Sequence, residues 1–506
     1  MQYIATAKEM KALEKYAMEE MGIPSLVLME RAALGISKEI KGYPGDRIEI
    51  CVVCGCGNNG ADGVAVARQL MEDNYKVDVV ILGKEEKFSE EMKVQMSIYK
   101  KMGGNCFTQI PDKKYDFFVD AIFGIGLTRE ITDEAILNAI DTINSSGAYI
   151  YSVDIPSGIH TDTGCVMGKA VKANRTIFFT CDKVGLCLYP GKEYAGMKIK
   201  HRIGICEEWI EALSIGQYRI TIEDCKRILK DYPSGHKGTF GKVLVIAGNH
   251  ETTGAALLCA KAVMKSGAGM VKVLSNSTTL KVLRTALPEA MTENLDDIQK
   301  APEIIKKAMD WADAVVCGPG IGTDDEAYKK VETVLREFPI GKKLVLDADA
   351  INLIAKNNEL KELTEKVKEV VYTPHMMELA RLTGMNIDTL KSDLDYVMRA
   401  KVCNENGIYV CKDSVTRVYA KDKPVFFNTG GNSGMATAGC GDVLAGMIAA
   451  FVARCGVDFY DGIIAAVSIH TFAGYKAADK IGKNSLMASD IIKEVTRILK
   501  SMEDIS

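Results

Sequence analysis

The regular alternation of short apolar runs with helical segments constrains the fold of this chain most strongly. From about residue 46, each apolar run is followed by a turn signal and then by a segment of helical periodicity. Strands alternating with helices predict parallel β-α-β units and a doubly wound α/β sheet. In the first half, the expected strands are residues 48–54, 76–82, 116–122 and 148–154, and the expected helices are residues 62–72 and 89–102.

The alternation is interrupted between about residues 205 and 237 and then resumes. At 506 residues the chain exceeds what one hydrophobic core organises, so we expect two domains, residues 1–216 and 217–506. The expected strands of the second series are residues 242–247, 270–274, 314–317, 344–347, 370–373 and 408–411, with a helix at 252–266 and a mostly helical end. We predict two doubly wound α/β domains.

Composition excludes several classes of protein. The net charge is −4 and the basic residues are scattered, so neither nucleic acid nor an anionic membrane is an expected partner. The longest near-apolar run, residues 443–453, is too short to span a membrane. Fifteen cysteines without regular spacing predict free thiols and a cytoplasmic protein.

Three loops of the first domain follow expected strands and carry glycine, amide or carboxylate groups: residues 58–63, 120–127 and 154–158. The carboxyl ends of parallel strands meet at one edge of a sheet, so these loops are expected to converge. Oxygen atoms of Asn59, Asp120 and Ser157 suit a hard cation. Asp154 leaves an apolar strand, and partial desolvation would favour a general acid or base there. The alternative is that each Asp only caps a helix.

The densest signal of the second domain is the glycine-rich stretch 428–442, which leads into the apolar helix expected at 443–453. Such a backbone cradles anionic oxygens at a positive helix end. Asp442 is poorly placed to bind phosphate but well placed to accept a proton from an attacking hydroxyl, which favours phosphoryl transfer to an alcohol. The alternative is a merely flexible loop. No P-loop motif is present.

The first 205 residues resemble the NAD(P)H-hydrate epimerase domain. The resemblance rests on residues 6–10, 22–24 and 28–32 together with the three loops. It implies a Rossmann-like three-layer sandwich, Asp154 as a catalytic residue and a potassium ion bound by Asn59, Asp120 and Ser157. Ala61 departs from the family, which usually has glycine there. The implied contacts to the hydrated dinucleotide are Asn58, Asn59, Gly60, Ala61, Asp62, Gly124, Ile125, Gly126, Leu127, Thr128, Arg129, Glu130 and Asp154.

From about residue 217 the chain resembles the ADP/ATP-dependent NAD(P)H-hydrate dehydratase domain, a ribokinase-like three-layer sandwich. Residues 235–241, 266–269, 287–289 and 439–442 carry the match. Asp413 and Cys440 stand where the family usually has glycine and serine. The resemblance implies a hydrated-dinucleotide site formed by Ala255, Gly320, His375 and the catalytic Asp442. It implies a nucleotide site formed by Lys412, Asp413, Ser414, Val415, Thr416 and Gly441.

Together, the resemblances imply a bifunctional repair enzyme. The first domain would interconvert the epimers of NADHX and NADPHX, the hydrated forms of NADH and NADPH, and the second would dehydrate one epimer. Phosphorylation of the ring hydroxyl by ADP or ATP, with Mg²⁺, would turn a poor leaving group into a good one. We also expect a homo-oligomer. The alternatives are a ribokinase-like small-molecule kinase and a first domain that only binds nucleotide as a regulatory module.

Overall fold

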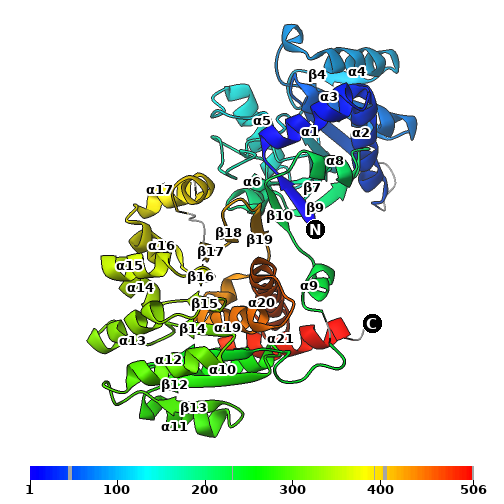
Figure 1. The fold of residues 1–506 in the computed structure, drawn as a ribbon. Helices are drawn as coiled ribbons and strands as arrows, with labels where there is room; N and C mark the ends of the chain where they lie inside the picture. Colours follow the sequence, from blue (N-terminus) through cyan, green and yellow to red (C-terminus); the bar gives the residue numbers. More distant parts are fainter. Residues whose placement is uncertain (44–47, 231, 393, 403–406, 504–506) are drawn as a thin grey trace. The chain divides into compact units, whose positions relative to one another are not determined.

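The computed structural model describes residues 1–43, 48–230, 232–392, 394–402 and 407–503 (Figure 1). The chain folds into two compact units. One unit runs from Tyr3 to Gln217, and the other contains the chain from Tyr218 onward together with Met1–Gln2.

The first unit is built on a parallel sheet of order β4-β3-β2-β5-β6-β7-β9. Its strands are β1 (Gln2–Ala5), β2 (Glu49–Cys54), β3 (Lys76–Ile81), β4 (Asn105–Phe107), β5 (Phe117–Ala121), β6 (Tyr149–Val153), β7 (Arg175–Phe179), β8 (Asp182–Lys183) and β9 (Met197–His201). Its helices are α1 (Ala7–Glu19), α2 (Ser25–Lys41), α3 (Asn58–Glu72), η1 (Glu85–Lys87), α4 (Glu90–Lys101), α5 (Glu134–Ser145), α6 (Val184–Cys187), α7 (Gly191–Tyr194) and α8 (Glu207–Ala212).

Both faces of this sheet are covered, as a three-layer sandwich requires. Ile50 and Val52 of β2 pack in a core with residues of α1, α2 and α3. Cys51 and Val53 of the same strand pack on the other side, with Ile140 and other residues of α5. The alternation follows from the two-residue period of a strand. The chain winds one way from β2 and the other way from β5, so a topological switch point lies between these two strands.

The second unit contains a sheet of order β13-β12-β11-β14-β15-β16-β17-β18-β19, parallel except for the last two pairings. Its strands are β11 (Lys242–Ile246), β12 (Met270–Ser275), β13 (Met291–Asn294), β14 (Ala314–Cys317), β15 (Lys343–Leu346), β16 (Val370–Tyr372), β17 (Gly407–Cys411), β18 (Thr416–Tyr419) and β19 (Val425–Asn428); β10 (Gln217–Arg219) lies across the division.

The helices of the second unit form two groups (Figure 1). Helices α10, α19, α20 and α21 contact one another, whereas α12 to α16 contact one another in a separate series. The helical segments are α9 (Ile222–Ile228), α10 (Thr253–Lys265), α11 (Ser277–Ala286), α12 (Ala301–Trp311), α13 (Asp325–Arg336), α14 (Asp349–Lys356), α15 (Asn358–Glu365), α16 (Met376–Thr383), α17 (Ile387–Ser392), α18 (Leu394–Val397), η2 (Met398–Val402), η3 (Ser433–Met435), α19 (Cys440–Ala453), α20 (Phe459–Ile481) and α21 (Ala488–Glu503). The prediction of two doubly wound α/β domains is confirmed.

Two helices begin earlier in the chain than the sequence predicts. Helix α3 begins at Asn58 rather than at residue 62, and α19 begins at Cys440 rather than at residue 443. The glycines at both places favour a loop in the sequence, but each helix tolerates glycine in its first turn.

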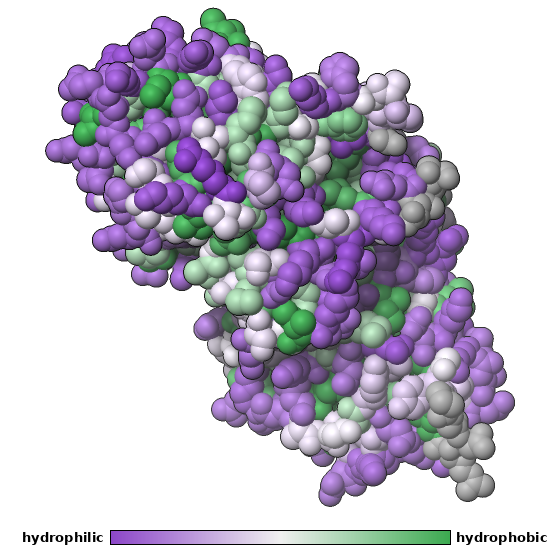
Figure 2. Space-filling view, turned by 90° about the horizontal axis from the view of Figure 1, so that it is seen from below, coloured by the Kyte–Doolittle hydropathy of each residue, from purple (hydrophilic) through white to green (hydrophobic). Residues whose placement is uncertain are grey.

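The face seen in Figure 2 is mostly hydrophilic with scattered hydrophobic residues. Among the described residues, no helix is long and apolar enough to cross a membrane.

Candidate active sites

The tight passage from β2 into α3 forms one wall of the first candidate site. A Cβ atom on Gly60 would lie 2.0 Å from the carbonyl oxygen of Gly55, so a side chain does not fit there. Gly57 precedes the helix and provides no side-chain cap. The N–H groups of the first turn of α3 are therefore available to a ligand, and the helix dipole favours an anionic one.

Residues 58–62 lie at the start of α3 in different environments. Asn58 is exposed, whereas Ala61 is fully buried in the core beneath the helix. The departure from the glycine usual at position 61 therefore places a methyl group in the core and leaves the ligand side of the turn unchanged. Burial, followed by the nearby Asp154 and Glu14, raises the pKa of Asp62 well above its usual range.

A fully buried carboxylate, Asp120, lies near the end of β5. One of its oxygens accepts hydrogen bonds from the Ser157 backbone N–H and the Ser152 hydroxyl, both at 2.8 Å. The other accepts from the Ser157 hydroxyl. Burial raises the pKa of Asp120 against these hydrogen bonds. No Lys or Arg among the described residues forms an ion pair with it, and a buried carboxylate without a cationic partner fits a cation site.

Asn59 faces the same region from α3. A Cβ atom on Gly124 would lie 2.9 Å from Asn59 Oδ1, so this amide lies against the loop that follows β5. Its buried Nδ2 atom has no hydrogen-bond partner. The three predicted cation ligands thus come from the start of α3, the end of β5 and the loop after β6. They contribute amide, carboxylate and hydroxyl oxygens, which suit a hard monovalent or divalent cation.

The loop 124–130 contains both exposed and buried side chains. Thr128, Arg129 and Glu130 are exposed, and Gly124 borders Asn59. The Leu127 side chain is buried in the core on the α5 side of the sheet. Only the backbone of Leu127 is therefore available to a ligand.

Asp154 follows β6 and adopts a left-handed backbone conformation, with φ of 62°. Its Oδ1 atom accepts a hydrogen bond from the Phe179 N–H at 3.0 Å and forms an ion pair with Lys183. The Lys183 side chain is fully buried and also donates to the Phe179 carbonyl oxygen at 3.1 Å. Asp154 caps no helix, which removes the alternative raised for it. The sequence-based reasoning missed Lys183, although it lies just beyond the carboxyl end of an apolar strand like the other candidates.

Glu14 on α1 is a second carboxyl that the sequence did not single out. Burial and the neighbouring Asp154 raise its pKa to about 7, against the opposing effect of Lys183 and Lys11. Helix α1 begins two residues after β1, and β1 pairs in parallel with β8, where Ala5 is opposite Lys183. This pairing brings α1 beside the Asp154–Lys183 pair.

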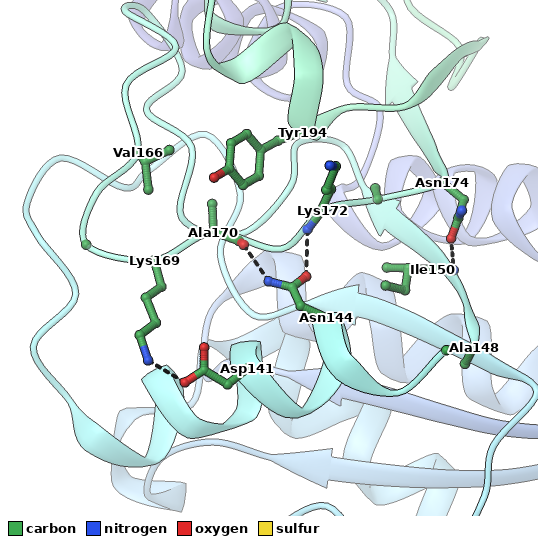
Figure 3. Close-up of a pocket in the computed structure, with 13 residues that line it drawn as sticks. Asp141, Asn144, Ala148, Ile150, Val166, Lys169, Ala170, Lys172, Asn174 and Tyr194 are labelled. Carbon is green, nitrogen blue, oxygen red and sulfur yellow. Dashed lines mark hydrogen bonds and ion pairs between the residues drawn. The ribbon is translucent and has the colours of Figure 1, made fainter.

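A separate cavity of about 720 Å³ lies at the opposite edge of the same sheet (Figure 3). Its polar groups satisfy one another: Lys169 pairs with Asp141, and Asn144 donates to the Ala170 carbonyl oxygen and accepts from the Lys172 N–H. It is lined from the start of β6, whereas Asp154 follows the end of that strand. The polar side chains of this cavity are already paired with one another. The candidate site is therefore assigned to the other end of β6, which Asp154 follows.

In the second unit, the switch point lies between β11 and β14. A Cβ atom on Gly320, which follows β14, would lie 2.9 Å from Ala255 Cβ in the first turn of α10. The Thr252 hydroxyl donates to the Gly320 carbonyl oxygen at 2.6 Å. The two predicted dinucleotide contacts, Ala255 and Gly320, are thus brought together at the edge where doubly wound sheets bind ligands.

Charged side chains gather at the start of α19. Gly439 precedes the helix with φ of 88°, and Asp442 lies in its first turn. Lys412 follows β17, and its Nζ atom is 2.8 Å from Asp347 Oδ1. A Cβ atom on Gly441 would lie 3.3 Å from that Nζ and 3.7 Å from Asp347 Oδ2. Helix N–H groups, an ammonium and two carboxylates therefore surround Gly441.

The ionisation of this group follows from burial and mutual charge. Burial and the carboxylate of Asp347 raise the pKa of Asp442 to about 7, and Lys412 opposes this effect. Burial lowers the pKa of Lys412, but Asp347 and Glu378 outweigh it, so the pKa is raised and the ammonium stays charged. Asp442 can therefore accept a proton near neutral pH beside a fixed positive charge.

His375 follows β16 and caps α16. Its Nδ1 atom accepts from the Met377 and Glu378 N–H groups, each at 3.2 Å, so the neutral ring carries its proton on Nε2. Burial, Lys412 and Arg381 lower the pKa of His375, which keeps the ring neutral. The side chain is half exposed, and the ring is available as a hydrogen-bond donor.

The other predicted nucleotide contacts form the turn between β17 and β18. Asp413 and Ser414 are exposed, Val415 is buried, and Thr416 begins β18. Asp413 Oδ1 accepts from the Ser414 N–H at 2.8 Å. Its charge is therefore held in the exposed turn rather than against the Asp347–Lys412 pair.

Family models match both halves of the chain: NAD(P)H-hydrate dehydratase over residues 243–497 and YjeF-related protein N-terminus over residues 25–185. A bifunctional NAD(P)H-hydrate repair enzyme Nnr of Moorella thermoacetica is 32% identical, covering 99% of this chain and 97% of the relative. One of Dictyoglomus turgidum is 33% identical, covering 97% of each. The chain belongs to the bifunctional NAD(P)H-hydrate repair enzyme family.

A solved structure supports the fold of the second half. The crystal structure of a ribokinase-like superfamily protein from Enterococcus faecalis is 28% identical, with a TM-score of 0.50, and covers 57% of this chain and 96% of that one. The predicted resemblance to the bifunctional NAD(P)H-hydrate repair family is confirmed over both halves.

Proposed function

We propose that residues 1–216 interconvert the epimers of NADHX and NADPHX, and that residues 217–506 dehydrate one epimer to NADH or NADPH with ADP or ATP as phosphoryl donor. The placement of Asp442 next to Gly441, against which the Lys412 ammonium and the Asp347 carboxylate lie, carries the dehydratase half of the proposal. It combines a proton acceptor with an anion-binding helix start, which phosphoryl transfer to a hydroxyl requires.

In the dehydratase step, Asp442 accepts the proton of the hydroxyl on the sixth ring carbon as that oxygen attacks the terminal phosphoryl group. The Lys412 ammonium and the N–H groups at the start of α19 stabilise the negative charge that moves onto the transferring group. Phosphate then leaves the sixth carbon and a proton leaves the fifth, which restores the ring double bond. Ala255, Gly320 and the Nε2–H of His375 hold the dinucleotide.

In the epimerase step, Asp154 is the proton acceptor. The first turn of α3 binds the phosphates of the dinucleotide. The residues fit a potassium ion, because Asp120 is buried with no cationic partner among the described residues and Asn59 Oδ1 lies against the loop after β5. Asn59, Asp120 and Ser157 would hold this ion. Bound there, potassium would supply fixed positive charge beside the substrate.

Magnesium is expected to bind together with the nucleotide. Within the described ranges, no three His, Cys, Asp or Glu side chains are grouped so that they could hold a metal ion. Magnesium would therefore arrive with the nucleotide and be bound largely through phosphate oxygens.

The test mixes the purified full-length chain with racemic NADHX, potassium, magnesium and either ADP or ATP. Recovery of the absorbance of reduced nicotinamide from both epimers supports both activities and identifies the donor. Recovery of half the material supports the dehydratase and contradicts the epimerase. A stable phosphorylated product without released phosphate would instead support a small-molecule kinase.

A further inference from the structure

The two oxygen atoms of Asp154 are in different situations. Oδ1 accepts from the Phe179 N–H and is paired with the Lys183 ammonium, whereas no described residue donates a hydrogen bond to Oδ2. The side chain is almost completely buried, at 8% exposure of the residue. Oδ1 is already occupied by two donors and the side chain keeps 11% exposure, so Oδ2 is the oxygen left for the substrate.

Burial and hydrogen bonding fix the Lys183 side chain as well as the Asp154 carboxylate that it contacts. Its side chain has no exposed surface, and its ammonium also donates to the Phe179 carbonyl oxygen at 3.1 Å. The same residue, Phe179, thus binds Asp154 through its N–H and Lys183 through its carbonyl oxygen. The parallel register of Ala5 opposite Lys183 fixes the backbone on the other side.

We propose that Lys183 is a positioning residue of the epimerase centre, which holds Oδ1 of Asp154 in place so that Oδ2 removes the proton in the reaction. The proposal rests on the proposed epimerase function. It does not require Lys183 to touch the substrate. The charged groups that face Asp154 from the packed elements are Lys183 of β8, Glu14 of α1 and Asp62 of α3, and Lys183 is the one cation among these three.

The proton balance of epimerisation requires one proton donor and one proton acceptor. The hydroxyl leaves the sixth ring carbon as water after gaining one proton, and the ring nitrogen supplies the electron pair that forms the C=N bond. Water then adds to the opposite face, the C=N electrons return to nitrogen, and one proton is lost. Asp154 Oδ2 takes this proton, while the protonated carboxyls of Glu14 or Asp62 provide the first.

The experiment compares Lys183→Met, Lys183→Arg and a matched control, Lys198→Met, in the full-length protein. Lys198 forms another largely buried ion pair of the same unit, with Asp182 at 2.6 Å, and does not contact Asp154. Interconversion of separated epimers is followed by chromatography at neutral pH. Lys183→Met should lower kcat roughly 100-fold with KM little changed, because Oδ1 of Asp154 is no longer held in place.

Lys183→Arg should recover part of the lost kcat, because it keeps a cation at Oδ1, and Lys198→Met should leave kcat and KM unchanged. An unchanged kcat in Lys183→Met would overturn the proposal. If the wild type itself does not interconvert the epimers, the epimerase function fails rather than the role of Lys183.

Removing one partner of a buried ion pair can prevent folding, so the double variant Asp154→Asn/Lys183→Met provides the second test. It contains no uncompensated charge at the pair and should fold. If Lys183 acts only through Asp154, the double variant should have the residual activity of Asp154→Asn alone. A further tenfold loss would show that Lys183 acts independently of Asp154 and would overturn the proposal.

Discussion

Lys412 and Asp347 form an ion pair of 2.8 Å at the start of α19, and both side chains lie against Gly441. The pair connects the loop after β15 with the loop after β17, so two strands of the same sheet, separated only by β16, fix its geometry. The Lys412 ammonium therefore compensates the charge of the Asp347 carboxylate by direct contact. It also opposes the increase in the pKa of Asp442 from a greater distance. This arrangement determines how the dehydratase reaction should depend on pH.

The rate of dehydration should rise with pH as Asp442 loses its proton. Burial and Asp347 raise the pKa of Asp442 to about 7, so a base with this pKa is protonated below that pH and active above it. We expect kcat/KM to increase through a single step centred near neutral pH. Asp442→Asn should lower kcat roughly 10²–10⁴-fold and abolish that step. Release of phosphate from the epimer that the second domain accepts measures both the rate and the step. A step that survives in the variant would belong to another group.

Substitution of Lys412 by methionine should move this step toward alkaline pH. The ammonium opposes the increase in the pKa of Asp442, so its removal favours the protonated acid further. The KM for the nucleotide should also increase, because a charge partner of the phosphates is lost. Lys423→Met, in the exposed loop between β18 and β19, provides the control and should change neither quantity. A step at the wild-type position in Lys412→Met would contradict the role assigned to the ion pair.

The sequence predicted most of the sheet framework, because apolar runs ending in glycine or acidic residues mark the strands and their carboxyl ends. This pattern predicts that Asp120, Asp154 and Gly320 lie at strand ends, which is where the structure has them. It does not point to Lys183 and Glu14, because their positions in the site depend on the pairing of β1 with β8. Strand β8 has only two residues and leaves no periodic signal in the sequence. Long-range contacts of this kind leave no local pattern in the chain.

The Ser157 hydroxyl should set the potassium dependence of epimerisation. It accepts a hydrogen bond from the Phe123 N–H at 2.8 Å and donates to Asp120. Ser157→Ala removes one cation ligand and one hydrogen bond to the buried carboxylate, so half-maximal activity should require roughly tenfold more potassium. Epimer interconversion titrated with potassium chloride measures this, with Ser146→Ala on the far end of α5 as the control. Equal potassium requirements in Ser157→Ala and the wild type would exclude Ser157 as a ligand.

Glu14 should make the stability of the first unit depend on pH. Its pKa is raised from 4.5 to about 7 by burial and by Asp154, so the folded state favours the protonated carboxyl. The stability from this group is fully present below the unfolded pKa of 4.5 and is lost as pH rises through about 7. Above that pH the folded carboxylate remains buried beside another negative charge.

Glu14→Gln removes the titrating group while keeping its size, so the variant should lose less stability than the wild type between about pH 5 and about pH 8. The difference should be about 1–2 kcal/mol, since partial exposure reduces the full effect of the shift. Hydrogen exchange of α1 in the full-length protein, measured at both ends of this range, reports the local free energy of opening. Glu19→Gln, on an exposed position of the same helix, should follow the wild type. If Glu14→Gln and the wild type lose protection equally with pH, Glu14 is ionised throughout and does not hold the proton that epimerisation needs.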